Sequence, residues 1–360
     1  MSEPLLQVEH LTTGFPATTG TLVAVNDVSF SIRQGETLCL VGESGSGKSL
    51  TAFSILRLVP SPGRILGGSI RFGGRDLLAL SEDEMCAVRG ADISLIFQEP
   101  MTALNPVFNV GDQIAESLVV HGRMAWRAAR VEAVRLMEAV RIPDAAARAR
   151  DYPHQLSGGQ RQRVLIAMAL ACKPALVIAD EPTTALDVTI QAQILDLLRQ
   201  LRAEHGLSLL LITHDLGVVA EMADRVAVMY AGRIVEQGPV EAIFAGPQHP
   251  YTKGLLASLP GSAPRQARGA ASSSSGGVQG SRSGRRLQAI DGTVPSLANL
   301  PPGCAFEPRC AERIPVCREA VPPLVTLGDD RAARCVHVLD HVRQPQSHGG
   351  STESGLGSTQ

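Results

Sequence analysis

Lysine is scarce in this chain of 360 residues: the 33 lysines and arginines include only three lysines, Lys48, Lys173 and Lys253. The bias toward arginine fits a GC-rich genome, and it makes any lysine within a chemical motif conspicuous. The formal net charge is only −2, so the sequence has no excess of positive charge of the kind that marks nucleic-acid binders. We therefore expect no nucleic-acid partner.

The sequence also lacks membrane and export signals. It contains no apolar run of about 18 residues, the length needed to span a bilayer. Its start, MSEPLLQVEH, has no basic segment followed by an apolar core, so it does not resemble a secretory signal. With 44% hydrophobic and 19% charged residues, the composition is that of a globular protein. These features predict a cytoplasmic protein, or one attached to a membrane only through partners.

Apolar runs that end in polar residues alternate with helical patterns over residues 1 to about 245. Near-continuous apolar runs are typical of parallel strands that are buried on both faces. The pattern therefore predicts an α/β fold whose chemistry lies at the carboxyl ends of the strands. The predicted strands are 37–42, 93–98, 175–180 and 207–215, and the predicted helices lie near 48–58, 126–140, 160–171 and 189–204.

Composition divides the chain further. An Ala- and Arg-rich, helix-like stretch over about 99–156 predicts a helical subdomain inserted into an α/β domain of residues 1–260. Residues 261–286 are rich in Ser and Gly and have too few apolar side chains to bury a core, which predicts a flexible linker. A cysteine-bearing extension over 287–342 follows, and 343–360 is predicted to be disordered.

Residues 42–49, GESGSGKS, match the phosphate-binding pattern G-x-x-x-x-G-K-[ST] between a predicted strand and a predicted helix. In such a loop, backbone N–H groups turn inward to bind phosphate, and the following helix adds the positive end of its dipole. We expect Lys48 to reach the β- and γ-phosphates and the Ser49 hydroxyl to ligate Mg²⁺. The remaining phosphate-contacting positions are Gly42, Ser44, Gly45, Ser46 and Gly47.

Polar residues follow three of the predicted strands. Asp180 ends LVIAD and is expected to hold Mg²⁺, and Glu181 is expected to orient the attacking water as general base. Gln98 ends ISLIFQ and is expected to touch Mg²⁺ or the attacking water, whereas His214 follows LLLIT and is expected to contact the γ-phosphate. Parallel-sheet geometry should bring these groups close to the phosphate-binding loop.

Residues 156–160, LSGGQ, lie between Gln98 and Asp180, and the combination resembles the ATP-binding cassette (ABC) ATPases over about residues 5–260. The resemblance implies a P-loop NTPase cassette with a helical subdomain. It makes Gln98 the Q-loop, Asp180 and Glu181 the Walker B carboxylates, Ala185-Leu186-Asp187 the D-loop and His214 the switch histidine. It also implies an aromatic ring on the adenine, for which Phe15 is the candidate. The signature positions are Leu156, Ser157, Gly158, Gly159 and Gln160.

Dimerisation follows from the same resemblance. Ser157, Gly158 and Gly159 precede a predicted helix and form a second anion-ready helix start. In the family, the signature of one subunit closes over ATP bound to the other, so that binding joins two cassettes and hydrolysis releases them. The resemblance leaves open whether the second ATPase subunit is identical or related.

Two stretches resemble one branch of the family, the dipeptide and oligopeptide importers: FQEPMTALNP at 97–106 and PQHPYT at 247–252. The chain looks like the D-type, or F-type, ATPase of such an importer. This implies two transmembrane permease subunits, an extracytoplasmic peptide-binding protein and a peripheral location on the cytoplasmic membrane face. Nickel or glutathione import, a soluble non-transport ABC ATPase and a redox or metal sensor remain the alternatives.

Four of the seven cysteines, Cys304, Cys310, Cys317 and Cys335, are spaced C-x5-C-x6-C-x17-C near the end of the chain. In a reducing compartment, clustered thiols are more often metal ligands than disulfides. Four thiolates suit Zn²⁺ or an iron–sulfur cluster, and the spacing fits neither zinc knuckles nor ferredoxin runs. The resemblance to peptide-importer ATPases implies a structural [4Fe–4S] cluster, with Zn²⁺ as the alternative.

Overall fold

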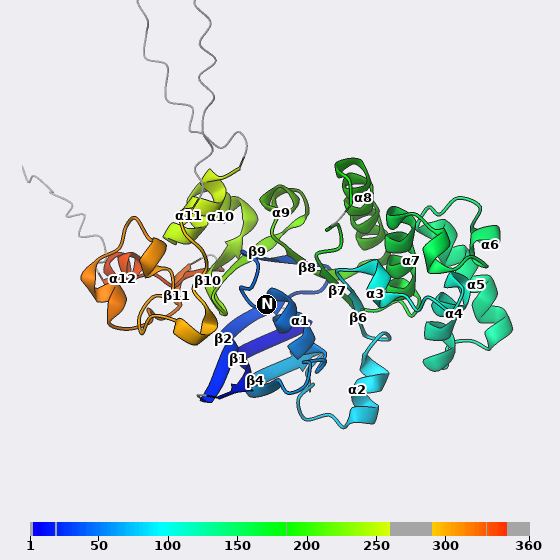
Figure 1. Ribbon diagram of the computed structural model, residues 1–360, viewed down its shortest axis with the longest axis horizontal. Helices are drawn as coiled ribbons and strands as arrows, with labels where there is room; N and C mark the ends of the chain where they lie inside the picture. Colours follow the sequence, from blue (N-terminus) through cyan, green and yellow to red (C-terminus); the bar gives the residue numbers. More distant parts are fainter. Residues whose placement is uncertain (1–2, 19, 185, 260–289, 329, 344–360) are drawn as a thin grey trace, which may run out of the picture.

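The computed structural model describes residues 3–18, 20–184, 186–259, 290–328 and 330–343. The predicted linker over 261–286, residues 344–360 of the predicted tail and Ala185 of the D-loop lie outside these ranges. Arg343, which was predicted to begin the disordered tail, instead ends a helix. Figure 1 follows the chain from the N-terminal strands, in blue, through cyan and green helices to the C-terminal segment in orange and red.

A central sheet organises the described residues. Its strand order is β11-β12-β10-β9-β3-β8-β7-β6, and the run from β9 to β6 is parallel. The four predicted strands are confirmed as neighbours at the β6 end of this sheet, in the order β3-β8-β7-β6, each somewhat shorter than its apolar run. Their bounds are Thr37–Val41 for β3, Ile93–Ile96 for β6, Leu176–Asp180 for β7 and Ser208–Thr213 for β8.

Both faces of this sheet are buried, which explains the continuous apolar runs. On β3, Leu38 and Leu40 pack into one hydrophobic cluster, whereas Cys39 and Val41 pack into the other. Helix α1, Lys48–Ile55, lies on the first side, and α8, Val188–His205, lies on the second. The predicted helices at 48–58 and 189–204 are thus confirmed.

A second, antiparallel sheet was not predicted. It has the order β2-β1-β4-β5 and pairs residues far apart in sequence, such as Leu6 with Phe72. Its inner face packs against α1 in the first hydrophobic cluster. The strands are Leu6–Ala17 for β1, Gly20–Ile32 for β2, Arg64–Phe72 for β4 and Arg75–Asp76 for β5, and α2, Glu82–Val88, follows them.

The stretch 99–156 is helical, as predicted, and its residues, all of which are described, contain no strand. It lies with α7 to the right in Figure 1, beyond the β6 edge of the central sheet. Helix α7 begins at Gly158, two residues before the predicted start. The elements are α3, Pro100–Ala103; α4, Val110–Val120; α5, Trp126–Ala139; α6, Ala145–Arg148; the 3-10 turn η1, Pro153–Gln155; and α7, Gly158–Leu170.

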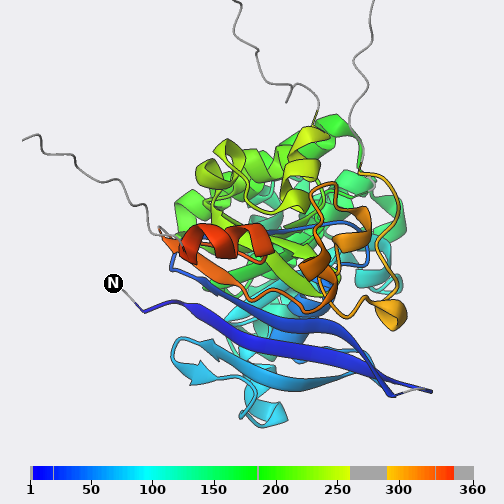
Figure 2. The ribbon, with the colours of Figure 1, turned by 90° about the vertical axis from the view of Figure 1, so that its left-hand side faces the viewer.

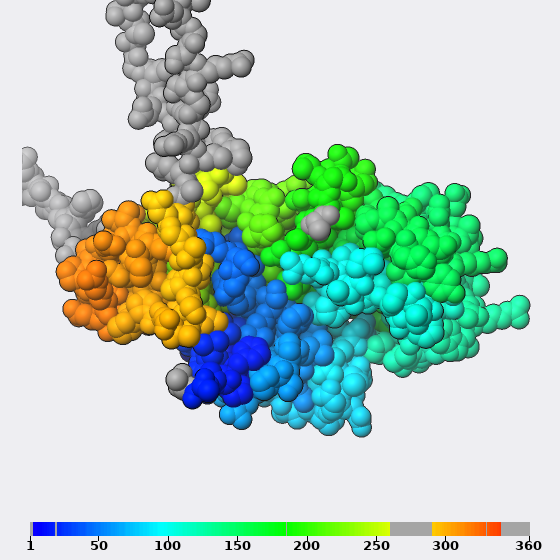
Figure 3. Space-filling model, in the orientation of Figure 1, coloured from blue at the N-terminus to red at the C-terminus, as the bar shows by residue number. Residues whose placement is uncertain are grey.

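At the opposite edge, the C-terminal segment extends the central sheet. Ala333 of β12 pairs with Glu236 of β10, and β11 pairs with β12. Figure 2 views this end of the molecule, and Figure 3 shows the orange C-terminal surface beside the blue N-terminal strands. The elements on this side are β9, Arg225–Tyr230; β10, Arg233–Pro239; β11, Val325–Gly328; β12, Arg331–Ala333; α9, Leu216–Met222; α10, Val240–Ala245; α11, Pro250–Ala257; α12, Val336–Arg343; and the 3-10 turns η2, Leu297–Asn299, η3, Glu307–Arg309, and η4, Pro315–Arg318.

Membrane-spanning helices are absent from the part of the chain that the structure describes: none of its helices has both the length and the apolar character that crossing a bilayer requires.

Candidate active site

The phosphate-binding loop connects β3 to α1, as the motif requires. Gly47 is the residue before the helix and has φ 101°, a conformation that favours glycine. A Cβ at this position would lie 2.8 Å from the carbonyl oxygen of Ala24, so any side chain would force the backbone to move. The glycine therefore lets the loop pass close to β2 while it turns into the helix.

Lys48 is buried at the centre of this loop. Its Nζ donates hydrogen bonds to the carbonyl oxygens of Gly42, at 2.8 Å, and Glu43, at 3.0 Å. Burial lowers the pKa of the Lys48 ammonium, and the carboxylates of Glu181, Asp180 and Glu43 oppose this shift. Three nearby carboxylates thus favour the charged form of a lysine that has little access to water.

Asp180 and Ser49 meet across the loop. The Ser49 hydroxyl donates to the Asp180 carboxylate at 3.0 Å, and Asp180 is only 2% exposed. Burial raises the pKa of Asp180, and the hydrogen bond from Ser49 partly opposes that rise. Two hard oxygen donors therefore sit side by side in a poorly solvated position, an arrangement suited to Mg²⁺.

Glu181 follows β7 with φ 46°, a left-handed conformation that is uncommon for residues other than glycine. Its backbone N–H still donates to Ile212 of β8 at 2.9 Å, so the turn is part of the sheet end. Strained backbone of this kind often marks functional positions, because the surrounding structure must maintain it. Here the turn carries the carboxylate out toward the phosphate-binding loop.

The predicted strand-end residues do converge on this carboxylate. Gln98 Nε2 donates to Glu181 Oε2 at 3.2 Å, and His214 Nδ1 lies 3.2 Å from the same oxygen. Gln98 lies in the loop after β6, which ends at Ile96 rather than at the glutamine. Thr184 was not predicted: its hydroxyl donates to Glu181 Oε2 at 2.9 Å, and its place three residues after Glu181 was the available signal.

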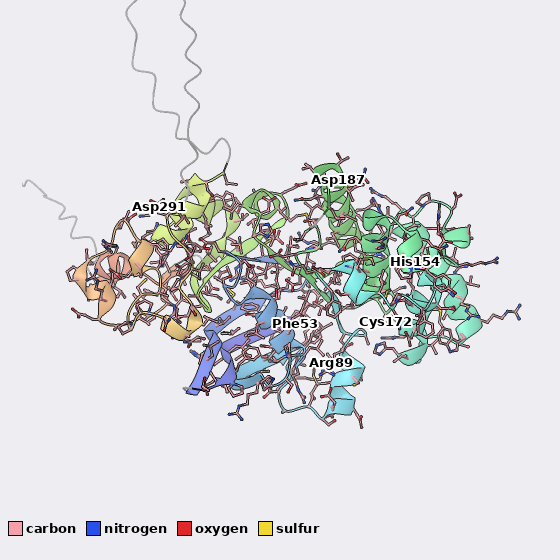
Figure 4. All side chains as sticks on the ribbon, viewed as in Figure 1. Phe53, Arg89, His154, Cys172, Asp187 and Asp291 are labelled. Atoms are coloured by element: carbon pink, nitrogen blue, oxygen red, sulfur yellow. The ribbon has the colours of Figure 1, made fainter. Side chains whose placement is uncertain are left out.

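Lys48, Ser49, Gln98, Glu181 and His214 line one cleft of about 810 Å³. Asp180 and Thr184 are not lining residues, but they are hydrogen-bonded to Ser49 and Glu181, which are. Phe15 on β1 forms part of its wall, as expected for an aromatic that stacks on a base. Phe53 of α1, labelled in Figure 4, and Leu255 of α11 also line it and were not predicted. The lining includes Gly42, Ser44, Gly45, Ser46, Gly47, Lys48, Ser49, Gln98, Glu181 and His214.

The signature residues lie elsewhere. Ser157 caps α7 by accepting a hydrogen bond from the Gln160 N–H, and the Ser157 N–H donates in turn to Gln160 Oε1 at 3.0 Å. Asp187 caps α8 by accepting from the Ile190 N–H at 2.9 Å, and Figure 4 shows it at the start of that helix. None of the described residues that line the cleft belongs to 156–160.

The four C-terminal cysteines converge on a separate small cavity, which His249 and Phe306 also line. Burial raises the pKa of Cys310 to about 11 and also raises the pKa of Cys304 and Cys335. Even so, among the described residues no group of three or more His, Cys, Asp or Glu side chains is placed to hold a metal ion. The predicted [4Fe–4S] cluster and the Zn²⁺ alternative therefore lack a preformed ligand group in this structure.

Comparisons with known proteins agree with this architecture. Residues 25–184 match the ABC transporter family, and residues 235–280 and 278–317 match the C-terminal region of oligopeptide/dipeptide transporters. The dimeric structure of MJ0796, a bacterial ABC transporter cassette, is 28% identical, with a TM-score of 0.59 over 65% of this chain and 98% of the cassette.

Curated relatives are similar over nearly the whole length. A putative peptide import ATP-binding protein of Brucella abortus is 52% identical, covering 93% of this chain and 97% of the relative. The dipeptide transport ATP-binding protein DppD of Bacillus subtilis is 50% identical, covering 92% of this chain and 94% of the relative. The chain therefore belongs to the ABC transporter family, among the ATP-binding proteins of peptide importers.

Proposed function

We propose that this chain binds ATP with Mg²⁺ in the 810 Å³ cleft, hydrolyses it, and thereby powers the import of dipeptides or oligopeptides through a membrane complex. The observation that carries the proposal is the convergence of Lys48, the Ser49–Asp180 pair and Glu181 on one cleft. The match of the C-terminal part to oligopeptide/dipeptide transporters supports peptides as the cargo.

We assign phosphate binding to the loop 42–47 and to Lys48. The N–H groups of the loop and the start of α1 offer positive potential to the phosphates. The Lys48 ammonium supplies a positive charge. When nucleotide binds, it would donate to phosphate oxygens in place of the carbonyl oxygens of Gly42 and Glu43. Ser49 and Asp180 would hold Mg²⁺, with Gln98 beside them, and the ion would neutralise charge on the β- and γ-phosphate oxygens.

Hydrolysis needs a group that orients water and accepts its proton. Glu181 is the candidate, because its carboxylate faces the cleft and is fixed by bonds from Gln98 and Thr184. His214 Nδ1 lies 3.2 Å from the same carboxylate, and we assign this histidine to contact with the γ-phosphate. Phe15 is assigned to the adenine, because its aromatic ring lines the cleft.

A second ATPase subunit would complete the site. Residues 156–160 and Asp187 lie apart from the cleft of their own chain, at the starts of two helices where N–H groups are available to an anion. We assign them to the nucleotide of a partner subunit, arranged head to tail. The similar cassette MJ0796 is dimeric in its solved structure, which supports this arrangement.

Membrane partners follow from the assigned family. Two transmembrane permease subunits and an extracytoplasmic peptide-binding protein would complete the importer, with this chain on the cytoplasmic face. The helical segment 99–156, with Gln98 at its start, is assigned to contact with the permease. This assignment rests on the resemblance and on the position of the segment beyond the sheet edge (Figure 1).

The cysteine cavity is assigned to a structural [4Fe–4S] cluster held by Cys304, Cys310, Cys317 and Cys335. Four thiols around one cavity form a soft donor set, which suits iron–sulfur chemistry. When bound, the cluster would cross-link the C-terminal segment.

The test is reconstitution of this chain with its permease subunits and peptide-binding protein in proteoliposomes. We expect ATP-dependent uptake of labelled peptide. Glu181→Gln should retain ATP binding and lower kcat by roughly 10²- to 10⁴-fold, the contribution of a general base. Lys48→Ala should weaken ATP binding.

The exposed Glu204 of α8 provides a matched control, because Glu204→Gln makes the same chemical change outside the cleft and should leave turnover unchanged. Normal turnover in Glu181→Gln would refute the base assignment. Uptake of nickel or glutathione in place of peptide would refute the assignment of peptides as the cargo.

A further inference from the structure

A buried arginine from the C-terminal segment contacts the phosphate-binding loop. Arg309 Nη1 donates to the Glu43 carboxylate at 2.9 Å, and the Arg309 side chain is only 6% exposed. Its other donors reach the Tyr230 hydroxyl at 3.3 Å and the backbone carbonyl oxygens of Ile290 and Asp291. Each of the three guanidinium nitrogens thus donates at least one hydrogen bond, and the residue lies 266 positions from Glu43 in sequence.

Glu43 is held by its backbone as well. Its N–H donates to the hydroxyl of Tyr251 at 2.9 Å, and its carbonyl oxygen accepts from Lys48. Tyr251 is fully buried and packs against Tyr230 and Phe306, with ring centroids 4.6 and 5.4 Å apart. Both the side chain and the backbone of this loop residue therefore depend on residues beyond 229.

The charge of Glu43 creates an electrostatic problem that Arg309 removes. Glu43 lines the cleft that is assigned to the triphosphate, where an unpaired carboxylate would repel an anionic ligand. A charge-assisted pair with Arg309 neutralises that carboxylate and also fixes its direction. Arg309 immediately precedes Cys310, so its position depends on the backbone that also carries a cysteine of the cavity.

We propose that Arg309 is a positioning residue for nucleotide binding, which acts through Glu43 and joins the cysteine-bearing segment to the phosphate-binding loop. The proposal rests on the proposed function, since it concerns ATP affinity. It makes the C-terminal segment part of the nucleotide site rather than an appendage attached to the cassette.

Attachment of the segment does not require this ion pair. Strand β12 pairs with β10, and Arg334 donates to Asp27 of β2 at 3.1 Å. Lys253 of α11 also pairs with Glu312 at 2.9 Å. Because these contacts hold the segment in place, loss of the Arg309 charge should act locally on Glu43 and the loop.

The experiment measures equilibrium binding of ATP to the full chain at low and at high ionic strength. Arg309→Gln should weaken ATP binding about tenfold at low salt, the size expected for one charge-assisted hydrogen bond, and less at high salt. Arg309→Gln combined with Glu43→Gln should return affinity to within about threefold of wild type, because no carboxylate is left to repel phosphate.

Controls separate this role from a purely structural one. Lys253→Gln breaks an ion pair to the same segment without touching the loop, and it should leave ATP affinity unchanged. Glu43→Gln alone should bind ATP at least as tightly as wild type. This single variant tests the proposal even if Arg309→Gln fails to fold, as judged by its thermal unfolding.

Three results would overturn the proposal: unchanged affinity in folded Arg309→Gln, equally weak binding in the double variant, or weaker binding in Glu43→Gln alone. If the wild-type chain itself does not bind ATP and Lys48→Ala makes no difference, the proposed function fails instead. The two failures are therefore distinguishable.

Discussion

His249 offers a quantitative test of how the cassette joins its C-terminal segment. The side chain is 1% exposed, and its Nδ1 accepts a hydrogen bond from the Tyr251 N–H at 3.1 Å, which caps α11. The His249 N–H donates to the buried carboxylate of Glu236 at 2.9 Å. Burial is the main cause that lowers the pKa of His249 from 6.5 to about 3, and the charge of Lys253 adds to it.

The sign of the stability effect follows from proton binding. In the unfolded chain, His249 takes up a proton below its ordinary pKa near 6.5, whereas the folded chain keeps it neutral down to about 3. The free energy of unfolding therefore falls as pH falls through this window, by about 1.4 kcal/mol per pH unit. Between about pH 7 and pH 5 the loss from this one residue is about 2 kcal/mol.

The assay compares denaturant unfolding of the full-length chain at these two pH values in wild type, His249→Asn and His205→Asn. The Asn amide oxygen retains a hydrogen-bond acceptor for the α11 cap and does not titrate. We expect His249→Asn to be less stable at pH 7 and to lose about 2 kcal/mol less than wild type on acidification.

His205, exposed at the end of α8, is the matched control, and its variant should follow wild type. Acid loss of any bound cluster would affect all three proteins alike. An equal acid loss in His249→Asn and wild type would refute the argument that His249 is buried neutral.

Three further predictions concern the cleft, the core and the cysteines. Phe15→Ala should raise the KM for ATP about 2- to 10-fold with little change in kcat, because the ring contributes only packing against the base. A steady-state ATPase assay measures both constants, and a fall in kcat with unchanged KM would contradict the prediction. Arg225→Met should lower the free energy of unfolding in urea by about 3–5 kcal/mol, because Glu36, which is 7% exposed, loses its ion-pair partner at 3.2 Å. A decrease below about 1 kcal/mol would refute this prediction. Anaerobically purified chain should contain iron and absorb visible light; a colourless preparation with one zinc per chain would exclude the cluster.

Four of the five parallel strands were predictable because their signal is local, whereas β9, which pairs parallel with β3, was missed. Strands buried on both faces need continuous apolar runs, so β3, β6, β7 and β8 were visible in the sequence. The antiparallel sheet was missed because it depends on pairing between distant segments, such as Leu6 with Phe72. Its bulged strands also blur the alternation of polar and apolar residues.

The groups proposed to bind and hydrolyse ATP were likewise predictable where a motif fixes their spacing. Lys48, Ser49, Asp180 and Glu181 belong to short patterns whose chemistry requires those residue types. The structure brings three of them to one cleft and places Asp180 in hydrogen-bond contact with Ser49. Thr184 was missed because a threonine three residues after a carboxylate is common in loops of every kind. Its role is visible only from the 2.9 Å bond to Glu181.

The sequence by itself determined the class of chemistry, since motif spacing identifies a phosphate-binding loop, a carboxylate pair and a signature without any coordinates. Only the tertiary structure decided that the C-terminal segment continues the central sheet through β12 and that Arg309 reaches Glu43. The physical reason is distance along the chain. Local motifs encode local backbone geometry, whereas an ion pair between residues 266 positions apart exists only after the chain has folded.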